Sequence, residues 1–107
     1  MGVWRGLALS LCMLVGGCVP REAPHIGAID PSNSIPAIQE AARTNDYKAI
    51  PAIVRQLDSD DPAVRFYAIE ALRKLTGQTL GYQFYDDAAL RKAEVARWKR
   101  WTDDHPQ

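Results

Sequence analysis

Residues 46–77 constrain the fold of this chain more than any other stretch. Apolar side chains recur at steps of three and four residues, first over 47–57 and again over 64–75. This spacing places them on one face of an α-helix, and such a face must be buried against another element. Between the two runs, Asp61 is suited to cap a helix and Pro62 to occupy its first position. The stretch therefore predicts two amphipathic helices joined by a tight acidic turn.

Weaker signals extend the helical region toward the N-terminus. The tetrapeptide Ile-Pro-Ala-Ile occurs at 35–38 and again at 50–53, so the helix-and-turn pattern is partly repeated. Ser34 is suited to cap the first helix. Pro51 indicates either that the second helix begins near Lys48 or that it bends at the proline.

The C-terminal part predicts a cover for the helix pair. Gly77 is suited to end the helix that begins at Pro62. The glycine- and aromatic-rich segment that follows is expected to fold back over the open end of the pair. Asp86 or Asp87 can then cap a last, basic helix that runs to about Trp101. We expect the tryptophan rings of this helix in the core; the alternative is a helix lying on anionic lipid.

Three segments together resemble a HEAT repeat. They are Ile50 through Leu57, the turn Asp60-Asp61-Pro62-Ala63-Val64-Arg65, and the run Ala68-Ile69-Glu70-Ala71-Leu72. The resemblance implies an all-α fold, a short HEAT-like α-solenoid of about four helices over residues 34–102, with a polar tail at 103–107. A plain antiparallel helical bundle is the alternative, because it follows the same packing rules.

The same resemblance implies a role for Arg65. In this family the arginine at that position commonly bonds an acid near the turn and helps to stack repeats. Asp58 or Asp60 is available for this pairing. Ser59 stands at the position where the family commonly has the acid.

The N-terminal residues have the character of a targeting signal. Arg5 precedes an apolar run over residues 7–15. A membrane-spanning helix needs roughly 18 or more apolar residues, so this shorter run predicts a secretory signal. It ends in Val15-Gly16-Gly17-Cys18, which resembles the lipobox of bacterial lipoproteins. An ordinary cleaved signal, with Cys18 incidental, is the alternative.

The lipobox resemblance implies a lipid-anchored protein of the bacterial envelope. The signal peptide, residues 1–17, would be removed, and Cys18 would receive fatty acyl chains such as palmitate. Two or three chains hold a protein firmly at a membrane, whereas one holds it marginally. Residues 18–33 would then form a flexible tether. Val19 follows the cysteine, a pattern that resembles outer-membrane sorting in bacteria with two membranes.

Several functional classes are not indicated. The formal net charge is zero, so no overall field attracts nucleic acid. We find no nucleophile near a histidine, no glycine-rich phosphate loop and no Cys/His metal cluster. The acids of the turn lack the glycine and distal glutamate of a calcium loop, and helix capping explains them better. We expect no enzyme activity, no cofactor and no metal site.

A protein-binding module remains. A helical wheel of residues 62–76 leaves Phe66, Glu70 and Arg73 outside the apolar stripe. HEAT-like solenoids use the second helix of each repeat to bind partners, so these residues are candidates for contact with an unidentified protein. Phe66 packed against a neighbouring helix is an equal alternative for that residue. Self-association is a further option, since one repeat leaves two open ends. The rival function is that of a structural accessory subunit or a lipid-surface helical bundle.

Overall fold

A computed structural model describes residues 23–107, and within them the regular structure is helical throughout. The elements are α1 (Pro31–Arg43), the short 3₁₀ helix η1 (Tyr47–Ala49), α2 (Ile50–Gln56), α3 (Pro62–Thr76) and α4 (Ala88–Asp104). The predicted all-α class with four helices is confirmed. The predicted signal peptide and Cys18 lie outside the described residues.

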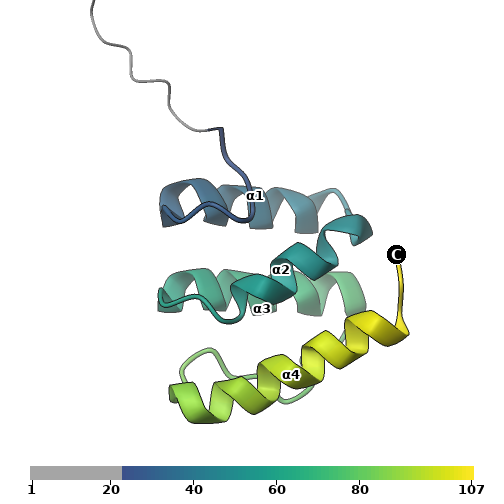
Figure 1. Ribbon diagram of the computed structural model, residues 1–107. Coiled ribbons are helices and arrows are strands. Elements are labelled where there is room, and N and C mark those ends of the chain that lie inside the picture. The colour runs from purple at the N-terminus through teal and green to yellow at the C-terminus, as the bar shows by residue number, and fades with distance from the viewer. Residues whose placement is uncertain (1–22) are drawn as a thin grey trace, which may run out of the picture.

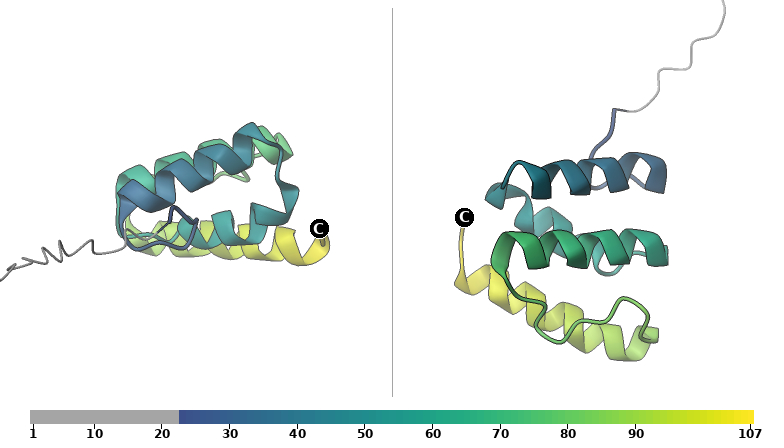
Figure 2. Two further views of the ribbon diagram at one scale, coloured as in Figure 1. Left: turned by 90° about the horizontal axis from the view of Figure 1, so that it is seen from above. Right: turned by 180° about the vertical axis from the view of Figure 1, so that it is seen from behind.

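The four α-helices form two layers. α1 packs against α3, and α2 packs against both α3 and α4. Figure 1 and Figure 2 show α1 and α3 in one layer and α2 and α4 in the other, so that successive helices alternate between layers. As a result, α1 lies at one end of the stack and α4 at the other.

α1 begins earlier than expected, and Ser34 is not its cap. Asp30 is the N-cap, because its Oδ1 accepts a hydrogen bond of 2.9 Å from the backbone N–H of Ser32. This bond lowers the pKa of the Asp30 carboxyl. Pro31 takes the first helical position, where its missing N–H costs nothing. Ser34 is instead buried inside the helix.

The predicted tether is correspondingly shorter than residues 18–33. Ala28 is buried, and the partly buried Ile26 packs against the core. Because Ile26 and Ala28 pack against the domain and Pro31 already lies in α1, the chain from Ile26 onward belongs to the helical domain. α4 also exceeds its expected end near Trp101 and continues to Asp104, into the predicted tail.

The turn between α2 and α3 follows the prediction. The Asp61 carboxylate accepts hydrogen bonds from the backbone N–H groups of Ala63 and Val64, at 2.7 and 3.4 Å, and Pro62 is the first residue of α3. Gly77 ends α3 in the left-handed conformation, with φ of 75°. Asp61 therefore acts as the N-cap of α3, as predicted.

Pro51 is accommodated at the start of α2 without a bend in the helix interior. η1 leads directly into α2, and Pro51 is the second residue of that helix. A backbone N–H at this position has no partner within the helix, so proline removes no helical hydrogen bond. The helix therefore starts near the proline, after a single 3₁₀ turn.

The core lies between the two layers, and α4 contributes its largest side chain. Trp98 has no exposed surface, and Trp101 packs beside it with ring centroids 5.6 Å apart. Trp98 is therefore a core residue, and the partly buried Trp101 packs against the core, as expected for a terminal cap. The other side chains with less than 2 % exposure include Ile38, Ile50, Ile53, Leu57, Leu72 and Val54.

The segment between α3 and α4 is held along α4 by side chains of that helix. Trp98 Nε1 donates to the Thr79 carbonyl at 2.9 Å, and Arg97 donates to the Leu80 carbonyl. Glu94 accepts from the backbone N–H of Gln83, and Arg91 donates to the Asp86 carbonyl at 2.6 Å. Loop residues of increasing number bond to α4 residues of decreasing number, so the loop and α4 run antiparallel.

The loop also covers the core with two of its three aromatic residues, Tyr82 and Phe84, as the sequence predicted, whereas Tyr85 is exposed. Tyr82 is buried, and its hydroxyl donates a 2.7 Å hydrogen bond to the Leu57 carbonyl at the end of α2. Burial raises the pKa of Tyr82 to about 12. The pKa of Glu94 is also raised, first by burial and then by its hydrogen bond with Asp86.

Candidate protein-binding surface

Phe66, Glu70 and Arg73 lie on one side of α3, as the helical wheel predicted. They are spaced by four and three residues, which is the spacing of a single helix face. Phe66 is 38 % exposed, and Glu70 forms an ion pair with Arg73 while both side chains reach solvent. The helix therefore presents one aromatic ring and one ion pair side by side.

A groove between α1 and α3 incorporates the ion pair. Its volume is about 380 Å³. Ala42 and Ala71, both buried, provide small apolar side chains, whereas the charged groups of Glu70, Arg73 and Lys74 reach solvent beside them. Gln39 and Tyr67 complete the lining. An apolar floor with polar groups at its edge is suited to receive a side chain of another protein.

Phe66 belongs to a row of four aromatic rings. The centroid distances are 5.2 Å from Tyr67 to Phe66, 5.2 Å from Phe66 to Phe84 and 5.3 Å from Phe84 to Tyr85, all edge-to-face. Tyr85, at the end of the row, is 68 % exposed. The two alternatives for Phe66 therefore both apply, because the ring packs against the loop and keeps an exposed edge.

Sequence reasoning did not identify Phe84 and Tyr85 as members of this surface. Their aromatic character led to the expectation that they cover the core, which holds for the partly buried Phe84 but not for Tyr85. The two residues are distant from Phe66 in sequence, and only the path of the loop brings them together. The sequence signal for them is a pair of adjacent aromatic residues, because one ring of such a pair can be buried while the other stays exposed.

Arg65 is buried but does not pair with an acid side chain. Its Nη1 donates to the Ser59 carbonyl at 2.7 Å and its Nε to the Phe84 carbonyl at 2.9 Å. In the described part of the chain, neither Asp58 nor Asp60 forms an ion pair with Arg65, and both are exposed, so the predicted pairing is wrong. The guanidinium instead connects the α2–α3 turn to the loop and fixes the backbone beneath the Phe84 ring.

In residues 23–107, no group of three or more His, Cys, Asp or Glu side chains is arranged to hold a metal ion. In the same part of the chain, no helix has both the length and the hydrophobicity that crossing a bilayer requires.

Comparison with known proteins gives one family match. A model of the family described as HEAT repeats matches residues 27–96, which include α1, η1, α2 and α3 and the first half of α4. No curated protein and no solved structure shows significant similarity to the chain. The match covers the alternating two-layer stack and the α3 face described above.

Proposed function

Because this chain belongs to the HEAT-repeat family, we propose that it is a non-catalytic adaptor that binds a protein partner through the α3 face. HEAT-repeat domains commonly act as scaffolds for protein–protein interaction, and the family carries no implied cofactor. The proposed contact surface comprises the row Tyr67, Phe66, Phe84 and Tyr85 and the adjacent groove with Glu70 and Arg73 at its edge. This surface is called the aromatic face below.

The observation that carries the proposal is the exposure of aromatic rings beside a charged groove. Aromatic residues and arginine are enriched where protein interfaces derive most of their binding energy. Tyr85 and Phe66 combine exposed area with rings that are held in place by edge-to-face neighbours. A rigid aromatic side chain loses little conformational freedom on binding, so such a row is suited to anchor a partner.

We expect the double variant Phe66→Ala with Tyr85→Ala to lose its partner. Each aromatic anchor typically contributes about 2 kcal/mol or more, so the pair should weaken binding at least about a hundredfold. The measurement is affinity capture of the full chain from its native membranes, with quantitative identification of co-purifying proteins. The matched control is Leu90→Ala, which removes a 56 % exposed apolar side chain from α4.

Proteins that co-purify equally with the wild type and the double variant would exclude the aromatic face as the binding surface. The accessory-subunit alternative would then be preferred, with contacts that do not depend on these rings.

The proposal extends to location, and places the protein in the bacterial envelope on a lipid anchor at Cys18. The support is the order of sequence features at the N-terminus: a positive residue, an apolar run shorter than a membrane span, two glycines and then the cysteine. Cleavage before Cys18 would leave a short tether of residues 18–25 ahead of Ile26. In a host with two membranes, the valine after the cysteine favours the outer membrane.

We expect Cys18→Ser to abolish both lipid attachment and signal removal. Mass spectrometry of the protein purified from its native membranes should find an acylated N-terminal Cys18 in the wild type. The variant should carry no acyl chain and should retain residues 1–17. Cys12→Ser is the matched control, because this cysteine lies within the signal and should behave as the wild type. A mature wild-type chain with an unmodified cysteine would contradict the anchor.

A further inference from the structure

Of the acidic residues among 23–107, only Glu94 is buried, with 8 % of its surface exposed. It lies on α4, where that helix meets the loop. Its Oε2 accepts a 3.3 Å hydrogen bond from the backbone N–H of Gln83, and its carboxyl group also hydrogen-bonds to that of Asp86. Two carboxyl groups form such a bond only while one of them carries a proton, because two carboxylates repel each other. A proton therefore helps to hold the loop on α4.

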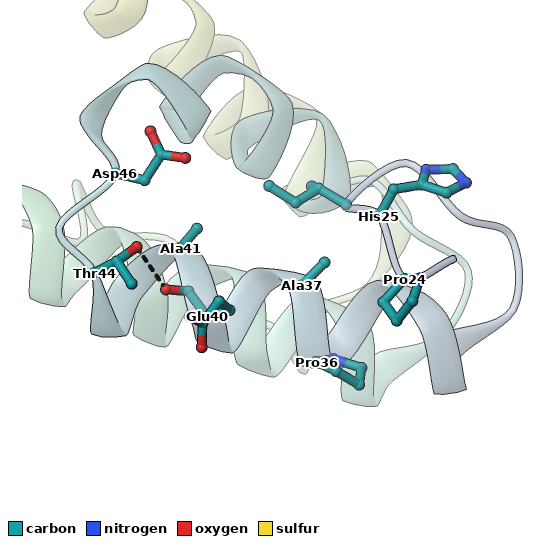
Figure 3. Close-up of a pocket in the computed structure, with 9 residues that line it drawn as sticks. Pro24, His25, Pro36, Ala37, Glu40, Ala41, Thr44 and Asp46 are labelled. Carbon is teal, nitrogen blue, oxygen red and sulfur yellow. Dashed lines mark hydrogen bonds between the residues drawn. The ribbon is translucent and has the colours of Figure 1, made fainter. Parts of the chain in front are cut away.

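An exposed glutamate of the same domain shows the opposite behaviour. Glu40 lines a groove that residues of α1 share with the segment before it (Figure 3), and it pairs with Arg43 in solvent. This hydrogen bond lowers the pKa of Glu40, whereas burial and then the bond with Asp86 raise the pKa of Glu94. A carboxyl group with a raised pKa stabilises the folded state below its ordinary pKa. That contribution is lost as the pH rises through the raised value.

The charges around Glu94 come from all the elements that meet there. Burial and Asp86 disfavour its ionised form, and the Gln83 N–H and Arg97 of α4 favour it. The buried Tyr82 connects Glu94 to the other helices. Besides burial, the charges that act on this tyrosine are those of Arg65 of α3, Arg91 and Glu94 of α4, and Asp58 after α2. Loss of the proton therefore adds a second negative charge at a crowded, partly dry contact.

The loop residues that Glu94 holds carry two rings of the aromatic face. Phe84 and Tyr85 lie between Gln83 and Asp86 in the chain. The backbone N–H of Asp86 donates to the Gln83 carbonyl at 3.1 Å, so these four residues form a single turn. Both ends of this turn contact the Glu94 carboxyl group. The position of the exposed Tyr85 ring therefore depends on that contact.

We infer that Glu94 is a positioning residue of the aromatic face, and that partner binding through this face tightens when Glu94 takes up a proton. The inference rests on the proposed function, since it concerns the same surface. Protonated Glu94 donates to Asp86 and accepts from Gln83, so Tyr85 stays in place. After ionisation the two carboxylates repel, and the turn loosens from α4. A mobile ring loses more conformational freedom on binding, so the partner is held less firmly.

NMR spectroscopy of the full chain in a mild detergent, from about pH 4 to about pH 8, tests the positioning role without a partner. The Glu94 carboxyl carbon should titrate with a pKa above 4.5, and the Tyr85 amide should become mobile over the same pH interval. Each unit by which this pKa is raised should weaken the attachment of the loop about tenfold. A Glu94 pKa at or below 4.5, or a Tyr85 amide with the same motion throughout the range, overturns the inference.

Three variants separate the proton from the contact. Glu94→Gln keeps a donor for Asp86 and an acceptor for Gln83 at every pH, so Tyr85 should stay ordered throughout. Asp86→Asn should also abolish the pH dependence, because only one charge remains and the new amide can donate to it. Glu94→Ala removes the contact and should leave Tyr85 mobile at every pH. A Glu94→Gln variant that keeps the wild-type pH dependence overturns the inference.

The matched controls are Asp87→Asn and Glu40→Gln. Each removes one exposed carboxylate, and asparagine caps α4 about as well as the aspartate it replaces. Both controls should keep the wild-type pH dependence of the Tyr85 amide. If either control abolished it, the effect would belong to the overall charge and not to Glu94, and the inference would fail.

Partner binding is then measured by capture from native membranes at about pH 5 and about pH 8. The probe is the set of co-purifying proteins that Phe66→Ala with Tyr85→Ala loses. The wild type should retain less of this set at the higher pH, by up to the factor measured for the loop, and Glu94→Gln should retain equal amounts. Equal recovery by the wild type at both pH values overturns this inference alone. The absence of any protein that depends on the two rings overturns the proposed function.

Discussion

Replacing Trp98 by alanine is expected to remove most of the stability of the helical domain. Trp98 is fully buried where α4 packs on the core, and its Nε1 holds the Thr79 carbonyl. Truncating a buried tryptophan typically costs about 3–5 kcal/mol. Small domains are stable by only about 5–15 kcal/mol, and this one lies at the low end by size. The loss is therefore comparable with the whole free energy of unfolding.

Thermal unfolding followed by circular dichroism provides the measurement. Trp98→Ala should melt without a cooperative transition or with a greatly lowered midpoint, and Trp98→Phe should fall between it and the wild type. Leu90→Ala, on the exposed side of the same helix, should leave the midpoint nearly unchanged. A Trp98→Ala variant that melts within a few degrees of the wild type would show that α4 is not part of the cooperative core.

The second large effect is expected for Arg65→Met. Methionine keeps an aliphatic stem of similar reach but leaves the carbonyls of Ser59 and Phe84 without their donor. A hydrogen bond to a charged group typically contributes about 1.5–3 kcal/mol, so losing two should destabilise the domain by about 3–6 kcal/mol. The loop should also become mobile near Phe84, because the guanidinium holds its backbone in place.

Two measurements separate these consequences. Chemical denaturation gives the free energy of unfolding, and NMR relaxation at the Phe84 amide reports the motion of the loop. Arg65→Lys should recover only part of the loss, since an ammonium group lacks the planar fork that reaches both carbonyls. Arg73→Met removes an exposed guanidinium from the same helix and should have little effect. If Arg65→Met and Arg73→Met proved equally stable, the assigned role of Arg65 would be wrong.

Local signals in the sequence were sufficient for the helices and for most of their ends. Asp61, Pro62 and Gly77 act at the positions that their capping and turn preferences indicate, because those preferences depend on neighbouring backbone atoms alone. The start of α1 was misplaced because Ser34 and Asp30 are both good caps. Ser34 is fully buried on the face of α1 that also carries Ile38, and this burial depends on tertiary packing.

The candidate site was predictable only in part, for the same physical reason. The face with Phe66, Glu70 and Arg73 follows from the helical period. The groove beside it requires the placement of α1 on α3, and the aromatic row requires the path of the loop. The partners of Arg65 are main-chain carbonyls, which are present at every residue, so no side-chain pattern could identify them.

The attachment of the loop to α4 has a consequence for how this chain can diverge among related proteins. Thr79, Leu80 and Asp86 are held by their backbone carbonyls, which every residue supplies, and Gln83 by its backbone N–H, which only proline lacks. The exposed side chains of the loop are therefore not required to maintain its shape. Gln78, Gln83 or Tyr85 can therefore be replaced by residues other than proline without loss of the hydrogen bonds by which α4 holds the loop.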